Sequence, residues 1–443
     1  MFDKIFAVLA AKARKPDQLM IDATHLDLPD SLMVLPEPCP DVRARMNDIP
    51  TPFVLAFNSG SSSLKFGLYR MAADGPVALI SGEIETLGDG RCRLRASNGA
   101  GASKIDESLN VADPAQGIGR LEALFAGANA PGAIGHRIVH GGPALRRHCL
   151  IDDRVQIALD AAVAFAPLHA PAALRVLHYA RQHFPGIPQV ACFDTAFHAD
   201  LPKTARTLPL PADLRAQGIQ RYGFHGLSCE SIVRQLGPGI ADRVVIAHLG
   251  NGASITAVKG GRSIDTSMGL TPSGGVIMGS RTGDIDPGIL LYLMREKGLG
   301  AAELEDLIDH RSGLAGISGI SSDVRRLDQV VNSEPDARLA LDMFEISVAK
   351  QIAAMIIALG GIDTLVFTGG IGENDARARG GIVDRLACFD LGLDPERNRH
   401  ASNPLSAAKS RAGVLALPSR EDDEIARHTA VLASPVRQPH AAE

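Results

Sequence analysis

Three glycine- and serine-rich turns contain the residue types that bind phosphate groups. They span residues 58–65 (NSGSSSLK), 248–252 (HLGNG) and 368–374 (TGGIGEN), and each follows an apolar, strand-like run. Small side chains let backbone N–H groups and hydroxyls approach phosphate oxygens, and Lys65 adds a positive charge. The first turn lacks the GxxxxGK[ST] pattern of a Walker loop and, taken alone, is better explained as an ordinary hairpin tip. The three turns together indicate nucleotide binding.

Charged residues in glycine-rich or apolar surroundings form a second set. Arg137 lies in HRIVHGG and Arg281 in MGSRTGDIDP. A planar guanidinium group can donate two parallel hydrogen bonds to one carboxylate or phosphoryl group. Both arginines are therefore candidates for binding an acyl phosphate. A structural arginine paired with a local carboxylate such as Asp284 explains either one about equally well. Asp194 ends an apolar strand, where a carboxylate is costly unless it meets a metal ion, an arginine or a proton.

Two histidines lie among apolar and aromatic residues. They are His225 in RYGFHG and His169 in APLHAP. A lone histidine in such surroundings is more often a hydrogen-bonded core residue, so spacing alone assigns a role to neither.

Apolar patterns predict the elements that position these residues. Residues 53–57 and 64–70 predict two strands joined by the first turn, and residues 244–248 and 255–258 predict a second hairpin of the same kind. This repetition indicates an internally duplicated fold. Further strands are expected at residues 189–193 and 364–367, and helices at residues 170–183 and 340–359, so the fold class is α/β.

Composition excludes several classes of function. The chain has 443 residues, a net charge of -5 and no long Lys/Arg run, which argues against nucleic acid or an anionic membrane surface as a partner. No uncharged apolar run approaches the roughly 20 residues that a membrane helix needs. The six cysteines lack paired spacings, which is typical of free thiols in a reducing cytoplasm. The length predicts two domains.

The N-terminal segment differs in character from the rest of the chain. Residues 27–52 are rich in proline and charge and predict a linker. Residues 1–26, especially KPDQLMIDATH, resemble a piece of an insertion-sequence transposase with Asp22 at its metal-binding position. One carboxylate cannot assemble a metal site, so we expect an inactive remnant.

Ten motifs in a fixed order resemble the acetate kinase family over residues 53–432. They are NSGSSSLK, GHRIVHGG, APLHAP, FDTAFH, YGFHG, HLGNGAS, MGSRTGDIDP, SSDVR, FTGGIGEN and the closing PSRE. The resemblance implies a duplicated ribonuclease H-like (actin-like ATPase) fold, with two domains around a central cleft, and a homodimer. The expected domains are residues 53–194 with 421–443, and a nucleotide-binding domain at residues 195–420, after an extension at residues 1–52.

The resemblance also implies roles for individual residues. The family's catalytic positions match Asp194, His225, Arg281 and His169. Its substrate-binding positions match Arg137, Val139, Leu168, Phe224 and Pro272, of which Arg137 grips the carboxylate. Its magnesium positions match Asn58 and Glu421. Its nucleotide positions match Lys65, Ser61, Ser63, His248, Leu249, Gly250, Asn251, Gly252, Asp323, Val324, Arg325, Gly370, Ile371, Gly372, Glu373 and Asn374.

The implied reaction is reversible transfer of the ATP γ-phosphoryl group to acetate, giving acetyl phosphate and ADP. ATP and ADP are the co-substrates, and Mg²⁺ is the metal, with Mn²⁺ as an alternative. A carboxylate needs no deprotonation before it attacks, so positioning and charge stabilisation dominate catalysis. Asp194 then has no proton to remove, and we expect it to orient an arginine or a magnesium-bound water.

The chain departs from the family pattern at several positions. Ser273, Gly274 and Gly275 replace the common Leu-Glu-Gly beside the acyl pocket, and Val324 stands where an aromatic residue or methionine is frequent. In the closing motif, REDDE replaces NEEL, which makes Asp422 a rival of Glu421 for the metal.

Other activities stay open from the sequence. A propionate or butyrate kinase differs only in pocket size, and one methylene in an apolar pocket is worth about 1–3 kcal/mol. A sugar kinase of the same fold would require a general base and a polar pocket. An actin-like ATPase switch would need the phosphate turns but would have no use for Arg137 and its apolar neighbours.

Overall fold

The computed structural model describes residues 53–60, 63–87, 89–98, 104–126, 130–167 and 170–434. The extension predicted at residues 1–52 lies outside these ranges, as do Ser61, Leu168 and His169. None of the helices within the described ranges combines the length and the apolarity that crossing a bilayer requires.

The first sheet has eight strands in the order β5-β4-β3-β2-β1-β6-β8-β7. Its strands are β1 (Phe53–Ser59), β2 (Ser63–Ala72), β3 (Gly75–Thr86), β4 (Cys92–Asn98), β5 (Lys104–Leu109), β6 (Ala133–Ile138), β7 (Cys149–Leu150) and β8 (Gln189–Phe193). β1 pairs antiparallel with β2 and parallel with β6, which pairs parallel with β8.

The second sheet repeats the central part of the first. Its five strands, in the order β11-β10-β9-β12-β13, are β9 (Arg243–Leu249), β10 (Ala253–Lys259), β11 (Arg262–Thr266), β12 (Thr364–Thr368) and β13 (Gly413–Ala416). β9 pairs antiparallel with β10 and parallel with β12, which pairs parallel with β13. Five strands of the first sheet, β3-β2-β1-β6-β8, follow the same plan, so the duplication predicted from the two hairpins is confirmed.

Helices cover both sheets and fill the connections between strands. They are α2 (Ile118–Leu124), α3 (Asp153–Ala162), α4 (Ala170–His183), α5 (Lys203–Arg206), α6 (Ala212–Ala216), α7 (Gly226–Leu236), α8 (Pro287–Lys297), α9 (Ala301–His310), α10 (Gly313–Ser318), α11 (Val324–Val330), α12 (Pro335–Leu359), α13 (Gly369–Asn374), α14 (Ala376–Asp384), α15 (Pro395–Arg399) and α16 (Glu421–Ala433). The helix predicted at residues 170–183 is α4, and the one predicted at residues 340–359 begins earlier, because Pro335 occupies its first turn.

The strands β1 and β9 are buried on both faces, which explains their continuous apolar sequences. In β1, Leu55 and Phe57 face a core closed by α2 and α4, whereas Val54 and Ala56 face a core closed by α16. The alternation follows from the two-residue period of a strand.

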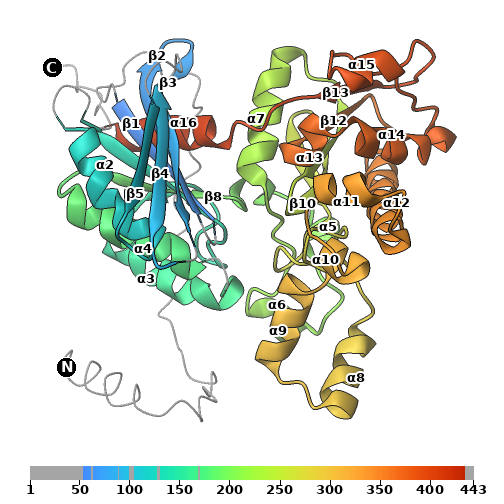
Figure 1. Cartoon of the computed structure of the whole chain (residues 1–443), viewed down its shortest axis with the longest axis horizontal. Helices are drawn as coiled ribbons and strands as arrows, with labels where there is room; N and C mark the ends of the chain where they lie inside the picture. The colour runs from blue at the N-terminus through green and yellow to red at the C-terminus, as the bar shows by residue number, and fades with distance from the viewer. Residues whose placement is uncertain are drawn as a thin grey trace, which may run out of the picture. The chain divides into compact units, whose positions relative to one another are not determined.

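The last helix, α16, returns to the first sheet, and α7 lies beside it (Figure 1). Ile425 and Ala430 of α16 pack against β1 and β8 together with Leu227 of α7. The next residues of α7, Cys229 and Ile232, pack instead against β9 and β12. A single helix therefore contributes to the cores of both sheets. The predicted domain bounds at residues 194/195 and 420/421 stay a prediction.

Candidate active site

Three polar side chains meet where neighbouring parallel strands end. Asn58 lies near the end of β1, Arg137 near the end of β6, and Asp194 directly after β8. Arg137 donates from Nε and Nη2 to the Asp194 carboxylate, at 3.0 and 2.6 Å to Oδ2, and from Nη1 to Asn58 Oδ1 at 3.1 Å. Ligands of open α/β sheets bind at this carboxyl edge. Arg137 is therefore paired with a carboxylate, as expected of an arginine with a purely structural role. The same contacts also hold its guanidinium group at the ends of the parallel strands.

Burial dominates the electrostatics of this pair. Burial raises the pKa of the Asp194 carboxyl group, and the Arg137 guanidinium opposes that rise. Burial alone lowers the pKa of Arg137, but Asp194 and Glu421 outweigh it and raise the pKa overall. Arginine stays protonated in proteins, so the pair is ionic. A carboxylate committed to a fixed cation is poorly suited to removing a proton.

The first turn of α16 brings two carboxylates to Asn58. Asn58 Nδ2 donates to Glu421 Oε2 at 3.2 Å and to Asp422 Oδ1 at 2.8 Å. Burial raises the pKa of both groups, but Arg137 reverses this for Glu421, whose pKa is lowered overall, while that of Asp422 is raised. The two carboxylates are a ligand type that Mg²⁺ prefers and fit a magnesium ion, with Asp422 closer to Asn58 than Glu421 is. Asn58 turns its Nδ2 to these carboxylates and its Oδ1 to Arg137, so its amide group would have to turn over before the oxygen could bind the ion.

His225 sits in a constrained backbone position before α7. Its φ of 57° is in the left-handed region, which a non-glycine residue seldom adopts. The imidazole stacks on His248 with ring centroids 4.1 Å apart, and Nδ1 lies 3.0 Å from Ser254 Oγ. Burial, aided by His248 and Arg137, lowers the pKa of His225 well below its usual value. The neutral ring is therefore held from two sides with Nε2 facing Gly252.

Arg281 approaches the same glycine from another loop. A Cβ atom on Gly252 would lie 3.3 Å from His225 Nε2 and 3.4 Å from Arg281 Nη1. Arg281 Nη1 donates to the Pro272 carbonyl at 3.2 Å, and burial lowers the pKa of Arg281. A side chain at this position would crowd both nitrogen atoms. His225 and Arg281, for which the resemblance implies catalytic roles, therefore both lie next to the second glycine-rich turn.

The predicted acyl pocket is apolar where the structure describes it. Val139 and Phe224 are buried in one hydrophobic cluster, and Pro272, whose carbonyl accepts from Arg281, is buried as well. Gly142 N donates to His140 Nδ1, so the His140 Nε2 hydrogen is directed at Leu270 O, 3.2 Å away. This bond ties the HRIVHGG segment to the loop that carries Pro272.

The nucleotide stretches contribute mainly backbone. Leu249 and Val324 are buried in the core, so their side chains are turned away from solvent. Arg325 is exposed and pairs with Asp323, which caps α11. Gly370 is exposed, and the predicted helix after the third turn is found as α13. These positions leave exposed glycine backbone beside the ends of β9 and β12.

Other nucleotide residues support neighbouring elements. Glu373 accepts from Gly369 N at 3.0 Å and from Ser419 N at 2.9 Å, which joins α13 to the segment before α16. Lys65 is exposed on β2, opposite Asn58 in the register. The nucleotide roles expected of Gly250, Asn251, Ile371, Gly372, Asn374 and Ser63 stay predictions.

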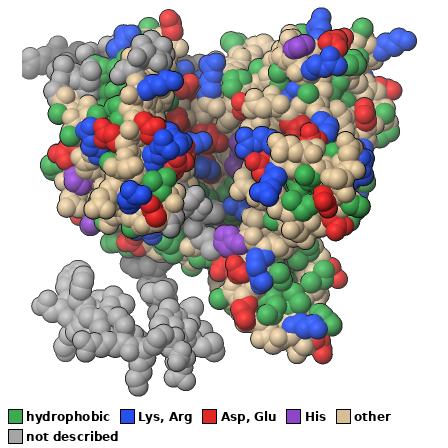
Figure 2. Space-filling model, viewed as in Figure 1, with side chains coloured by type: hydrophobic (Ala, Val, Ile, Leu, Met, Phe, Trp, Pro, Cys, Tyr) green, Lys and Arg blue, Asp and Glu red, His purple; other side chains and the backbone are tan. Residues whose placement is uncertain are grey.

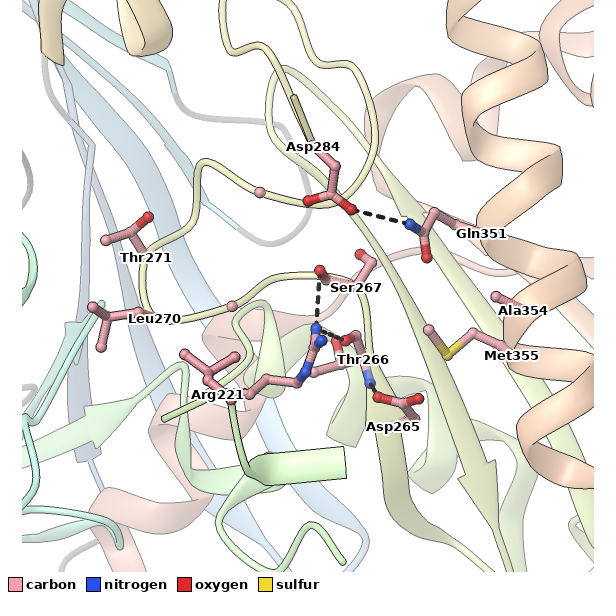
Figure 3. Close-up of a pocket in the computed structure, with 13 residues that line it drawn as sticks. Arg221, Asp265, Thr266, Ser267, Leu270, Thr271, Asp284, Gln351, Ala354 and Met355 are labelled. Atoms are coloured by element: carbon pink, nitrogen blue, oxygen red, sulfur yellow. Dashed lines mark hydrogen bonds between the residues drawn. The ribbon is translucent and has the colours of Figure 1, made fainter. Parts of the chain in front are cut away.

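A pocket of about 440 Å³ lies beside the loop that carries Pro272 (Figure 3). Leu270, Thr271 and Gly274 line it, together with Arg221 and Asp284. Arg221 donates to main-chain carbonyls, with Nη1 2.7 Å from Thr266 O. None of the described side chains predicted for catalysis or phosphate binding lines this pocket, so it is separate from the candidate active site.

Three contributors to the site were not predicted. His140 contacts Leu270 O and so holds the loop that carries Pro272. Ser254 orients His225, and His198 donates from Nε2 to the Phe224 carbonyl at 3.0 Å. His140 and His198 belong to quoted motifs, HRIVHGG and FDTAFH, so the histidine near the end of each motif was the available signal.

The fold and the site define a class of protein. Two sheets of the same strand plan, with glycine- or serine-rich turns after β1 and β9 and Arg137 near the end of β6, are the features of a kinase with the duplicated actin-like ATPase fold. A family model described as the acetokinase family matches residues 53–427. The chain belongs to this family, which confirms the resemblance, the fold class and the expectation of a phosphotransferase.

Several relatives cover nearly the whole described chain. An acetate kinase from Nitrobacter hamburgensis is 42% identical over 386 residues, which are 85% of this chain and 95% of the relative. A crystal structure of Porphyromonas gingivalis acetate kinase matches with a TM-score of 0.77 and 34% identity, covering 86% and 99% of the two chains. A propionate kinase from Francisella tularensis matches with a TM-score of 0.80 and 35% identity, covering 85% and 98%.

Proposed function

We propose that the protein is an acetate kinase, which reversibly transfers the γ-phosphoryl group of ATP to acetate and forms acetyl phosphate and ADP. The observation that carries this proposal is the fixed position of Arg137 between Asp194 and Asn58, where the parallel strands β1, β6 and β8 end. A guanidinium group held at this edge suits the carboxylate of a small acid. The family membership supports the same reaction.

The chemistry assigned to these residues is positioning and charge stabilisation. Arg137 binds the acetate carboxylate, one oxygen of which attacks the γ-phosphorus while the bond to the ADP oxygen breaks. Arg281 and the Nε2 hydrogen of neutral His225 bind the equatorial oxygens of the transferring group. Asp194 keeps Arg137 in place and takes no proton. His169 is proposed as a further active-site histidine.

Magnesium and nucleotide complete the proposed site. Asn58, Glu421 and Asp422 would hold Mg²⁺, or Mn²⁺ in its place, and a bound cation would neutralise charge on the phosphates. Lys65 and the backbone of Gly250, Gly252 and Gly370 would contact the phosphates of ATP or ADP. The remaining residues that match the family's nucleotide positions would surround the nucleoside.

A propionate kinase is the second candidate, because one structural neighbour is named a propionate kinase. Measuring kcat/KM for acetate, propionate and butyrate distinguishes them. A clear preference for butyrate would overturn the acetate assignment, and equal values for acetate and propionate would support a broader acyl kinase.

Trapping the product separates an acyl kinase from an ATPase switch. ATP, Mg²⁺, acetate and hydroxylamine should yield acetohydroxamate with this protein. ATP hydrolysis without acetohydroxamate would overturn the proposed function.

We also propose a homodimer that forms through α8 and α12. Apolar side chains on these helices are exposed, including Leu291 at 55% and Tyr292 at 52% on α8. Figure 2 shows apolar side chains gathered on the surface over α8, at the lower right. Contiguous exposed apolar surface is typical of a contact with a second copy. Sedimentation of the wild type and of Tyr292→Glu tests this, since the variant should be monomeric.

The cytoplasm is the proposed compartment. The cysteines within the described ranges, Cys92, Cys149, Cys192, Cys229 and Cys388, are all free thiols. Free thiols are typical of a reducing compartment.

A further inference from the structure

Two ion pairs connect α7 to α16. Arg234 donates from Nε and Nη2 to the Glu424 carboxylate at 2.7 and 2.8 Å, and His428 Nε2 lies 2.9 Å from Glu230 Oε2. Glu424 is 2% exposed and His428 7%. We call these four residues the α7–α16 ion-pair ladder.

The ladder is ionic and is not a metal site, although His148, Glu230 and His428 lie close enough to share an ion. Phe193 N donates to His148 Nδ1 at 3.0 Å, so this nitrogen offers a lone pair. The hydrogen of the neutral ring is then on Nε2, the atom that faces Glu230 and that a metal would need without its hydrogen. Glu230 and Glu424 are balanced instead by His428 and Arg234.

Each helix carries a proposed active-site residue at its start. α7 begins directly after His225, and α16 begins at Glu421. At about 1.5 Å per residue, Glu424 is less than one turn from Glu421 and Glu230 is little more than one turn from His225. The two starts are also joined by Ser419 Oγ, 3.0 Å from Ser228 Oγ. A shift of one helix along the other would therefore move Glu421 relative to His225.

The ladder opposes displacement of one helix against the other. Moving Glu424 away from Arg234 would leave its buried carboxylate without this bidentate partner, while Arg234 would keep only its contact of 3.4 Å with Glu230. Buried charges tolerate such mismatches poorly, and their best-attested use is to specify one register. Hydrophobic contacts alone, such as Leu227 with Ile425, lack this selectivity.

We propose that Arg234 and Glu424, assisted by Glu230 and His428, are positioning residues for phosphoryl transfer. The ladder holds the magnesium-binding start of α16 at a fixed distance from His225. This inference rests on the proposed function for the role of Glu421 and His225. Arg137, the proposed acetate-binding residue, lies on β6 and has its main anchor in Asp194, which is not on either helix.

The test compares Arg234→Met with the double variant Arg234→Met/Glu424→Met. The single variant leaves Glu424 buried and unpaired, so its melting temperature should fall. The double variant replaces the pair by apolar side chains of similar size, which is often neutral for stability. We expect both variants to require about tenfold or more Mg²⁺ for half-maximal activity, with a kcat reduced by a similar factor and an unchanged KM for acetate.

The control is Arg243→Met, which removes a partly exposed bidentate pair with Asp363 where β9 and β12 begin. It should lower the melting temperature without changing the Mg²⁺ requirement. If the double variant recovers both stability and normal Mg²⁺ dependence, the ladder is structural and the inference is wrong. Titration of the wild type and variants with Mg²⁺ and ADP by calorimetry, which needs no acetate, gives the same comparison. If the wild type formed no acetohydroxamate, the proposed function would be wrong, and this result would be distinct from any effect of the ladder variants.

Discussion

The Arg137 guanidinium donates three hydrogen bonds to the buried carboxylate of Asp194. A carboxylate that accepts this many bonds from one cation acts as its anchor. We therefore expect Asp194→Asn to raise the KM for acetate about tenfold while kcat at saturating acetate stays near that of the wild type.

Arg281→Ala is the comparison for that variant. Removal of one group that stabilises the transition state should cost about 10² or more in kcat. Steady-state kinetics with acetate and ATP varied separately distinguish the two. If Asp194→Asn lost as much kcat as Arg281→Ala, Asp194 would have a direct part in the reaction.

Neutral His225 leads to a prediction for pH dependence. Burial lowers the pKa of His225 well below its usual value, so the ring stays uncharged as the pH falls through about 6.5. The profile of kcat/KM should show no inflection near pH 6.5 from this residue. His225→Ala should reduce kcat by about 10². An inflection near 6.5 that disappears in the variant would contradict the assignment.

Glu421 and Asp422 should contribute to metal binding, whereas the next residue of α16, Asp423, should not. Glu421→Gln and Asp422→Asn should each raise the Mg²⁺ concentration for half-maximal activity about tenfold or more, because each replaces a charged carboxylate by a neutral amide. Asp423→Asn is the control, since Asp423 bonds with Tyr69 and not with Asn58. A normal Mg²⁺ requirement in Asp422→Asn would leave Glu421 as the acidic ligand.

Neighbouring glycines of the third turn should have separable effects. Gly369 has a φ of +76°, and its Cβ would lie 2.7 Å from Leu249 O, so Gly369→Ala should lower the free energy of unfolding by about 1–2 kcal/mol or more. A Cβ on Gly370 would meet no atom within 4 Å. Gly370→Val should therefore keep the melting temperature and raise the KM for ATP. An unchanged KM would place the phosphates elsewhere.

Buried histidines should make the fold sensitive to acid. Burial lowers the pKa of His136, His140, His148 and His198 to about 4. Unfolded histidines titrate near 6.5, so below that pH the unfolded chain binds more protons. This stability is complete above pH 6.5 and is lost as the pH falls toward 4. His198→Gln should show a shallower decline in melting temperature over this range than the wild type.

Local sequence patterns predicted the repeated part of the fold well. The strand at residues 189–193 and the helix at residues 170–183 have the predicted bounds, because each has a consistent period between clear breaks. The strands β3 to β5 were not predicted. The KIDESL segment of β5 has no fully buried residue and alternates only weakly. Each of these strands pairs with the one before it, β3 with β2, β4 with β3 and β5 with β4, and this pairing rather than the local pattern makes β5 a strand.

The site residues depended on long-range pairing. Arg137 and Asp194 are 57 positions apart and meet because β6 and β8 are adjacent and parallel, which spacing along the chain does not reveal. The motifs indicated their residue types, and the family resemblance indicated their roles. The contact of Asp422 with Asn58 also needed the return of α16 to the first sheet.

That return has a consequence for synthesis on the ribosome. The face of β1 that carries Val54 and Ala56 is closed by Ile425 and Ala426, which are made after every strand of both sheets. The first sheet must therefore wait, with this face uncovered, until α16 has emerged. Nascent chains of this protein should need protection from aggregation until α16 has emerged, and truncation before residue 421 should leave an insoluble product even though every strand of both sheets is present.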